Sequence, residues 1–256
     1  MRNDEELRVA VRAAKAAGRA VRGHFGSKDR VVQKSEKEFV TRSDIASQNI
    51  ILRALSRAFP SYGYVSEEKS TRLKRSEKPL WIIDPLDGTH NFISGIPFFG
   101  ISIGLYAKDA FQLGVIYFPL QKKLFTARRG SGAYCDGKRI RVSDNPKLSR
   151  AMVAYDNQFH RAQGAYHRYK RLASSAFTTR ILGSAACDLC FIAEGVLDAR
   201  VLNNAKLCDF AAGCVILAEA GGLVTDFSGK PVGLGTSQIA ASNSRIHAEL
   251  LKTLKV

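Results

Sequence analysis

Four strand-like segments follow one another closely between residues 80 and 130, and they constrain the fold more than any other part of the chain. They read LWIID (80–84), FFGISIGLYA (98–107), AFQLGVIYFP (110–119) and KLFTARRG (123–130). The last three are joined by turns of a few residues, and such short connections join antiparallel strands, because parallel neighbours need a long crossover. The region therefore predicts an antiparallel meander, which a short hairpin around Asp136 and Gly137 extends.

Helical patterns precede this meander, and alternating strands and helices follow it. Residues 4–25 and 43–58 carry apolar side chains at helical spacing, and the second segment ends before Pro60. Beyond about residue 145, strand-like and helical segments alternate up to the strongly apolar helix DFAAGCVILAEAGG (209–222), which a glycine pair ends. We expect an α+β protein with two domains, 1–144 and 145–256. The first would hold the antiparallel sheet.

The composition is that of a globular protein and excludes a membrane-spanning class. The chain has 256 residues, 45% of them hydrophobic, and no apolar run approaches the ~20 residues that cross a bilayer. Its five cysteines are an odd number in a chain without an export pattern, which favours reduced, buried thiols and a cytoplasmic location over disulfides. Cys187 and Cys190 form a C-x-x-C within a helical segment, with no second pair for zinc.

The net charge is +16, and the basic excess lies in residues 1–180. Such a charge indicates anionic partners, namely phosphorylated substrates, nucleic acid or an anionic surface, although it can also serve solubility alone. The sequence shows no RNA-recognition motif and no basic stripe interleaved with aromatic residues. Nucleic acid is therefore not the favoured partner.

Carboxylates lie at the ends of several predicted elements. Asp84 and Asp87 end the buried strand WIIDPLDG, Glu67 precedes a basic loop, Asp209 begins the late apolar helix, and Asp44 begins an earlier one. Each has an ordinary structural alternative, such as a helix cap, a turn or a solvated loop end. As a set, in a chain whose five histidines lack ligand spacing, they indicate an oxygen-rich site that suits Mg²⁺ and not zinc.

A cation would also relieve the repulsion between Asp84 and Asp87. After Asp87, the segment DGTHNF predicts a turn that enters a helix, so the amides of Gly88 and Thr89 can face an anion. Metals beside such amides form a phosphate site. Paired metals that hold the attacking and leaving oxygens are a common solution for phosphoryl hydrolysis.

Four ordered segments then make the chain resemble the inositol monophosphatase family, the lithium-sensitive, Mg²⁺-dependent sugar phosphatases. They are KSEKEFVTRSD with SEE, WIIDPLDGTHNFISGIPFFGISIGL, GSAACDLCFIAEGVLDA and CDFAAGCVILAEAGG, with the central sheet between the second and third. The resemblance covers nearly the whole chain. It implies the layered α-β-α-β-α sandwich of the sugar phosphatases, two to three Mg²⁺ ions per active site and a homodimer.

The same resemblance assigns the metal ligands. Glu67 and Asp84, with the backbone carbonyl of Leu86, would hold one Mg²⁺. Asp84, Asp87 and Asp209 would hold the second, and Glu67 would help to hold a third. Most of these ligands precede residue 144, whereas Asp209 comes from the second predicted domain.

The resemblance also implies the catalytic residues and the residues that bind phosphate and substrate. Asp44 and Thr89, beside Glu67, would orient and deprotonate the attacking water, and the amides of Gly88 and Thr89 would bind phosphate. Glu68 and Lys34 would support the metal ligands without binding the metal themselves. The resemblance further implies substrate contacts at Asp87, Arg180, Gly183, Ser184 and Ala185.

Departures from the family pattern bear on the substrate. Cys208 stands where a tryptophan is usual, and Leu202 stands where inositol-specific members carry a glutamate for the sugar hydroxyls. Arg180 is similar to a basic residue of archaeal-type members that also hydrolyse fructose 1,6-bisphosphate, although it could be an ordinary charge at a strand edge. We expect a phosphomonoesterase for inositol 1-phosphate or a related sugar phosphate. The alternatives are a dual fructose-1,6-bisphosphatase and an RNA- or transcription-associated binding protein.

Overall fold

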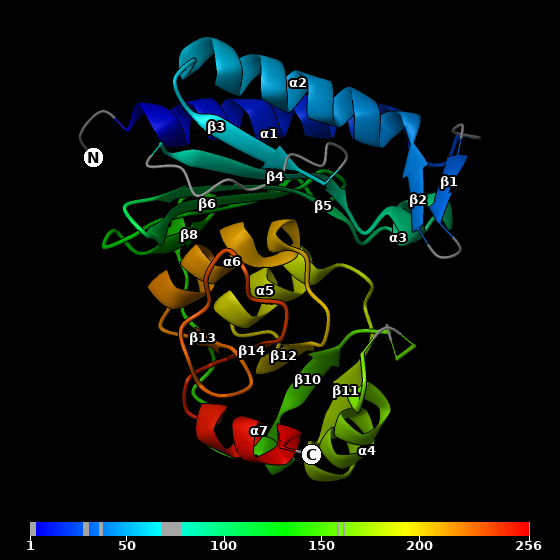
Figure 1. Ribbon diagram of the computed structural model, residues 1–256, viewed down its shortest axis with the longest axis vertical. Helices are drawn as coiled ribbons and strands as arrows, with labels where there is room; N and C mark the ends of the chain where they lie inside the picture. Colours follow the sequence, from blue (N-terminus) through cyan, green and yellow to red (C-terminus); the bar gives the residue numbers. More distant parts are fainter. Residues whose placement is uncertain are drawn as a thin grey trace.

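The protein forms five layers, helix, sheet, helix, sheet and helix, stacked along its long axis (Figure 1). The structure is a computed structural model that describes residues 4–27, 31–35, 38–67, 78–157, 159–160 and 162–255. The layering confirms the predicted sandwich. The first sheet ends at Arg139 and the second begins at Met152, while the division of the chain at residue 144 into two domains stays a prediction.

The first sheet contains the predicted meander. Its seven strands lie in the order β3-β4-β5-β6-β7-β8-β9. All neighbours are antiparallel except β3 and β4, which run parallel, so the meander and its terminal hairpin are confirmed. The strands are Gly63–Ser66 (β3), Leu80–Asp87 (β4), Gly100–Ala107 (β5), Ala110–Phe118 (β6), Lys123–Arg128 (β7), Ala133–Cys135 (β8) and Lys138–Arg139 (β9).

Two long helices, α1 (Glu5–His24) and α2 (Arg42–Ala58), cover the outer face of this sheet. Val9 and Ala13 of α1 and Ile51 of α2 belong to one buried cluster with Trp81 and Val115 of the sheet. The helical spacing of the apolar residues creates this buried face. A hairpin of β1 (Val31–Ser35) and β2 (Glu38–Thr41) leads into α2, and it was not part of our sequence-based expectation.

Helices α5 (Ala185–Ala193) and α6 (Leu207–Glu219) form the middle layer. Both are apolar nearly all round, because each packs against a layer on either side. The backbone of α6 lies so close to β6 that a Cβ atom at Gly114 would come within 2.2 Å of the carbonyl oxygen of Ala212. This tight packing fixes the start of α6, and hence Asp209, against the first sheet.

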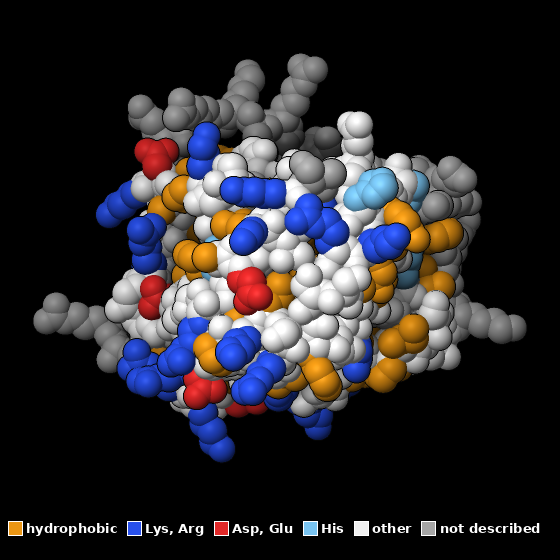
Figure 2. All heavy atoms as spheres, turned by 90° about the horizontal axis from the view of Figure 1, so that it is seen from below, with side chains coloured by type: hydrophobic (Ala, Val, Ile, Leu, Met, Phe, Trp, Pro, Cys, Tyr) orange, Lys and Arg blue, Asp and Glu red, His pale blue; other side chains and the backbone are white. Residues whose placement is uncertain are grey.

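The second sheet is mixed and has the order β11-β10-β12-β14-β13. Strand β10 runs parallel to β11 and β12, whereas β14 is antiparallel to both of its neighbours. These strands are Met152–Tyr155 (β10), Thr178–Arg180 (β11), Ala199–Leu202 (β12), Leu223–Thr225 (β13) and Ile239–Ser242 (β14). Helices α4 (Ala165–Ser175) and α7 (His247–Leu254) cover its outer face. Figure 2 views this end of the molecule, where Lys and Arg side chains are spread over the surface.

Candidate active site

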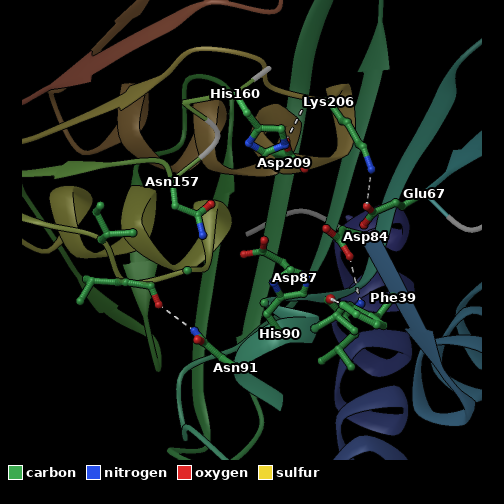
Figure 3. Close-up of a pocket in the computed structure, with 16 residues that line it drawn as sticks. Phe39, Glu67, Asp84, Asp87, His90, Asn91, Asn157, His160, Lys206 and Asp209 are labelled. Carbon is green, nitrogen blue, oxygen red and sulfur yellow. Dashed lines mark hydrogen bonds and ion pairs between the residues drawn. The ribbon is translucent and has the colours of Figure 1, made fainter. Parts of the chain in front are cut away.

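Four acidic side chains line one cavity of about 410 Å³ between the first sheet and the middle layer. Asp84 and Asp87 come from β4, Glu67 follows the parallel strand β3, and Asp209 lies in the first turn of α6. Figure 3 labels the four residues around the cavity, with the carboxylates of Glu67 and Asp84 close together. Residues separated by more than a hundred positions in the sequence therefore meet at one place.

A break in β4 directs its two carboxylates into the cavity. The pairing of β4 with β5 is interrupted between Asp84 and Asp87, around Pro85, which has no amide hydrogen to donate. The carbonyl of Pro85 accepts a hydrogen bond from the Ser47 hydroxyl at 2.6 Å, and Asp84 Oδ1 accepts one from the Leu86 amide at 3.0 Å. The proline thus ends the regular pairing between the two acids.

The electrostatics of the cavity favour a bound cation. Burial, followed by repulsion from Glu67, Asp87 and Asp209, raises the pKa of Asp84 well above its usual range. Burial, followed by repulsion from Glu67 and Asp87, raises the pKa of Asp209 to about 8. Burial is also the largest cause that raises the pKa of Asp87 to about 6. Four carboxylates are oxygen ligands of the kind that Mg²⁺ prefers, so the donor set fits such an ion.

Protein donors hold several of these oxygens. Asp87 accepts hydrogen bonds from the Ser184 hydroxyl and from the amides of Ala185 and Ala186, the amides at 3.2 and 2.8 Å. Lys206 Nζ lies 3.0 Å from Glu67 Oε1 (Figure 3). Within the described residues, no three acidic, histidine or cysteine side chains form a ready-made metal cage. A cation would therefore displace Lys206 from Glu67 or reorient the carboxylates.

Asp44 and Thr89 lie beside the acidic set and contact each other. The Thr89 hydroxyl lies 3.0 Å from Asp44 Oδ1 and 2.9 Å from the carbonyl oxygen of Leu86. The other Asp44 oxygen accepts the Thr41 amide at 2.7 Å and completes the capping box of α2. Burial raises the pKa of Asp44, although these hydrogen bonds oppose the rise. One carboxylate thus caps a helix and orients a hydroxyl at the cavity.

The turn that follows Asp87 requires a glycine. Gly88 has φ +93°, and a Cβ atom there would lie 3.1 Å from the carbonyl oxygen of Phe98. The short helix α3 (Thr89–Ile93) starts directly after it. The predicted entry from a turn into a helix at DGTHNF is therefore present.

Eight of the fourteen residues assigned from the sequence line this cavity, and Asp44, Ser184 and Ala185 are hydrogen-bonded to lining residues. Its lining includes Glu67, Asp84, Leu86, Asp87, Gly88, Thr89, Gly183 and Asp209. Arg180 is exposed at the end of β11 and donates to the Thr178 hydroxyl and the Thr179 carbonyl. Glu68 lies outside the described residues. Lys34 lies in β1, with its side chain outside the described part.

The cavity also contains residues that sequence reasoning missed. Asn91 donates to the carbonyls of Phe98 and Leu182 at 2.8 and 2.7 Å, so it ties α3 to the turn before α5. Lys206, Asn157 and His160 line the wall near Asp209. Of these residues, only Lys206 could have been inferred from the sequence. It is three residues before Asp209 and therefore lies in the same helical turn.

Two expectations about the chain as a whole can also be compared with the structure. All five cysteines are free and buried, as predicted. Cys208 packs against Ile82 and Ala211 in a small apolar cluster behind Asp209. Among the described residues, no helix combines the length and the apolar character needed to cross a membrane.

Comparisons with known proteins identify the family of this chain. A model of the inositol monophosphatase family matches residues 2–255. A fructose-1,6-bisphosphatase/inositol-1-monophosphatase from Aquifex aeolicus is 38% identical over 97% of this chain and 95% of its own length. The Nus factor SuhB of Pasteurella multocida is 34% identical over the same shares. A crystal structure of the extragenic suppressor protein suhB from Bartonella henselae superimposes with a TM-score of 0.93 at 35% identity, covering 98% of this chain and 99% of that one.

Proposed function

This chain belongs to the inositol monophosphatase family and is a phosphatase, and we propose that it is a Mg²⁺-dependent phosphomonoesterase. Its substrate would be inositol 1-phosphate or a related sugar phosphate. The observation that carries the proposal is the convergence of Glu67, Asp84, Asp87 and Asp209 on one cavity. A protein that only binds a partner has no need for four clustered carboxylates that repel one another, two of them buried.

The carboxylates would hold two to three Mg²⁺ ions. Glu67, Asp84 and the Leu86 carbonyl would hold one, and Asp209 with Asp84 and Asp87 would hold another. When bound, Mg²⁺ supplies positive charge to the phosphate oxygens and lowers the pKa of water. The raised pKa of Asp84 and Asp209 supports this assignment, because crowded carboxylates gain most from a cation.

Residues of the chain would position the reactants. Asp44 accepts a hydrogen bond from Thr89, which leaves lone pairs of the hydroxyl oxygen available to accept a proton of the attacking water. The amides of Gly88 and Thr89 lie at the start of α3 and would donate to the phosphate. Asp87 is fixed by Ser184 and the first amides of α5, so the substrate turn and the acidic set form one unit.

Phosphate release from a panel of sugar phosphates tests this proposal directly. We expect release in Mg²⁺ and none in EDTA, with modest selectivity among monophosphates, because Leu202 offers no acceptor to a sugar hydroxyl. If no substrate releases phosphate in Mg²⁺, the phosphomonoesterase assignment is wrong.

Arg180 is our candidate for the recognition of a second phosphate. It ends β11, and residues 181–183 then run along the cavity wall. We expect Arg180→Ala to lower kcat/KM for fructose 1,6-bisphosphate by roughly ten- to a hundredfold, the loss of one charge-assisted bond of ~1.5–3 kcal/mol. Inositol 1-phosphate should lose little. Arg171→Ala, at an exposed arginine of α4, is the matched control, and equal losses on both substrates would exclude the second-phosphate role.

A second candidate function uses the basic surface to bind RNA. Arg8, Arg12, Lys15, Arg19 and Arg22 of α1 are all exposed and recur every three or four residues, so they form one positive stripe. Similarity to proteins named Nus factor SuhB also supports this alternative. Retention of an RNA oligonucleotide at physiological salt, together with no phosphate release, would favour it.

We further propose that the enzyme is a cytoplasmic homodimer. Free, buried cysteines support a reducing compartment. Strand β11 lies at the edge of the second sheet, and Phe177 and Ile181 on either side of it are 73% and 44% exposed, which is typical of surfaces that a second subunit covers. Light scattering of the purified protein should give twice the monomer mass of 28.1 kDa; a monomer would contradict the proposal.

A further inference from the structure

The short helix α3 carries Thr89 at its first position and Asn91 in its middle. It contains five residues, too few for a helix to be stable through its own backbone hydrogen bonds. The position of the Thr89 hydroxyl at the cavity therefore depends on the contacts of α3 with the rest of the protein. Asn91 makes two of these contacts, and the residue is only 8% exposed.

The side-chain amide of Asn91 donates two hydrogen bonds. Its Nδ2 atom donates to the carbonyl oxygens of Leu182 and Phe98, at 2.7 and 2.8 Å. Two converging carbonyl oxygens need two donors, and asparagine supplies both from one short, neutral side chain. Serine would supply one donor and an ionised aspartate none. The two contacts therefore require asparagine at this position.

The segment 182–186 holds the chain on both sides of Thr89. The Ser184 hydroxyl and the two amides that follow it donate to Asp87, and the first carbonyl of the segment accepts from Asn91. Both ends of the turn into α3 are thus fixed to the same piece of backbone. The Thr89 hydroxyl cannot shift relative to Asp87 unless one of these hydrogen bonds breaks or the whole segment moves.

Gly183 provides the space that the Asn91 amide fills. Its φ angle is +82°, and a Cβ atom there would lie 2.9 Å from Asn91 Oδ1 and 3.0 Å from Nδ2. All three atoms nearest to that position belong to Asn91. The amide therefore packs directly against the backbone of the segment, so a change in its size or shape must displace either the segment or α3.

We propose that Asn91 is a positioning residue that sustains the rate of phosphate hydrolysis by holding the Thr89 hydroxyl in place. This inference rests on the proposed phosphomonoesterase function, in which Thr89 orients the attacking water. The hydroxyl lies 3.0 Å from Asp44 Oδ1, a contact that a small shift of α3 would break. A misplacement of about 1 Å can cost roughly a hundredfold in rate. Asn91 thus acts on the reaction through Thr89.

A double-mutant cycle with Thr89 tests this role, measured on the best sugar phosphate of the panel. Asn91→Ala should lower kcat about ten- to a hundredfold and leave KM little changed. Thr89→Ala/Asn91→Ala should have nearly the kcat of Thr89→Ala alone, because the group that Asn91 positions is already absent. Mg²⁺ should raise the melting temperature of Asn91→Ala as much as that of the wild type, since the four acidic side chains remain.

Asn49→Ala, at an exposed asparagine of α2, is the matched control and should behave like the wild type. If Asn91→Ala melts below the assay temperature, Asn91→Asp replaces it in the cycle. That variant keeps the shape of the side chain and removes both donors, so the same result is expected.

Three outcomes would overturn the role of Asn91 alone: losses in kcat that multiply in the double variant, a rise in KM without a loss in kcat, and wild-type kinetics. Failure of the wild-type protein to release phosphate from any substrate of the panel would overturn the proposed function together with this inference.

Discussion

Asp84→Asn is expected to abolish phosphate release and, at the same time, to raise the melting temperature of the protein in EDTA. Asp84 is buried, and three other carboxylates repel it. A neutral side chain of the same shape removes this repulsion, and its oxygen can still accept the Leu86 amide. The substitution should also remove the ligand that we propose to be shared by two Mg²⁺ ions. Function and metal-free stability should therefore change in opposite directions.

The pH dependence of stability provides a second readout. The folded protein holds the pKa of Asp84, Asp87 and Asp209 above the usual value of 3.8, the last two at about 6 and 8. It therefore binds more protons than the unfolded chain above pH 4. Metal-free stability should fall as the pH rises from about 4 to about 8, and Mg²⁺ should raise the melting temperature most at the upper end.

Thermal melts at pH 5 and pH 8, each in EDTA and in Mg²⁺, measure this effect beside the phosphate assay. Asp84→Asn should flatten the pH dependence in EDTA and reduce the shift that Mg²⁺ causes. Asp109→Asn, in the exposed turn between β5 and β6, is the matched control and should behave like the wild type. Near-normal turnover of Asp84→Asn at saturating Mg²⁺ would refute the assignment of this residue.

The sequence predicted those parts of the fold in which the spacing of apolar residues agrees with the turns and helix ends that bound each element. The meander has long apolar strands and short turns, and α1, α2 and α6 have buried faces with clear ends. The short strands β1, β2, β13 and β14 contain only three to five residues, too few for a pattern of alternation to stand out. Their pairing depends on distant partners, such as β12 for β14, and not on local propensity.

Local sequence patterns also predicted the acidic residues of the candidate site. The prediction was incomplete, because other site residues are brought together only by long-range contacts. Acidic residues at the ends of apolar segments are conspicuous, because local structure alone does not account for the whole set. The contact between Lys206 and Glu67 joins residues 139 positions apart, and no local pattern indicates it. Asn91 lies in the segment THNFI, and only the structure shows that its side chain ties α3 to the carbonyl of Leu182 before α5.

Thr89→Ala is expected to lower kcat by ~10²-fold or more, the usual contribution of general-base catalysis, with KM little changed. The Thr89 hydroxyl lies between Asp44 Oδ1 and the Leu86 carbonyl, at 3.0 and 2.9 Å. Alanine leaves both acceptors in place but removes the group that we propose to orient the attacking water. The substrate phosphate would keep its other contacts, so binding should be nearly unaffected. Steady-state kinetics in Mg²⁺ separate the two parameters.

Thr89→Ser is the matched control, because it restores the hydroxyl and should return kcat close to the wild-type value. The alanine variant should also change the pH profile. The hydrogen bond from Thr89 lowers the pKa of Asp44 and so opposes the effect of burial. Its loss should raise that pKa, keep Asp44 protonated to higher pH and move the acidic limb of the kcat profile upward in pH. A rise in KM alone, with kcat and its pH profile unchanged, would instead make Thr89 a residue that only binds substrate.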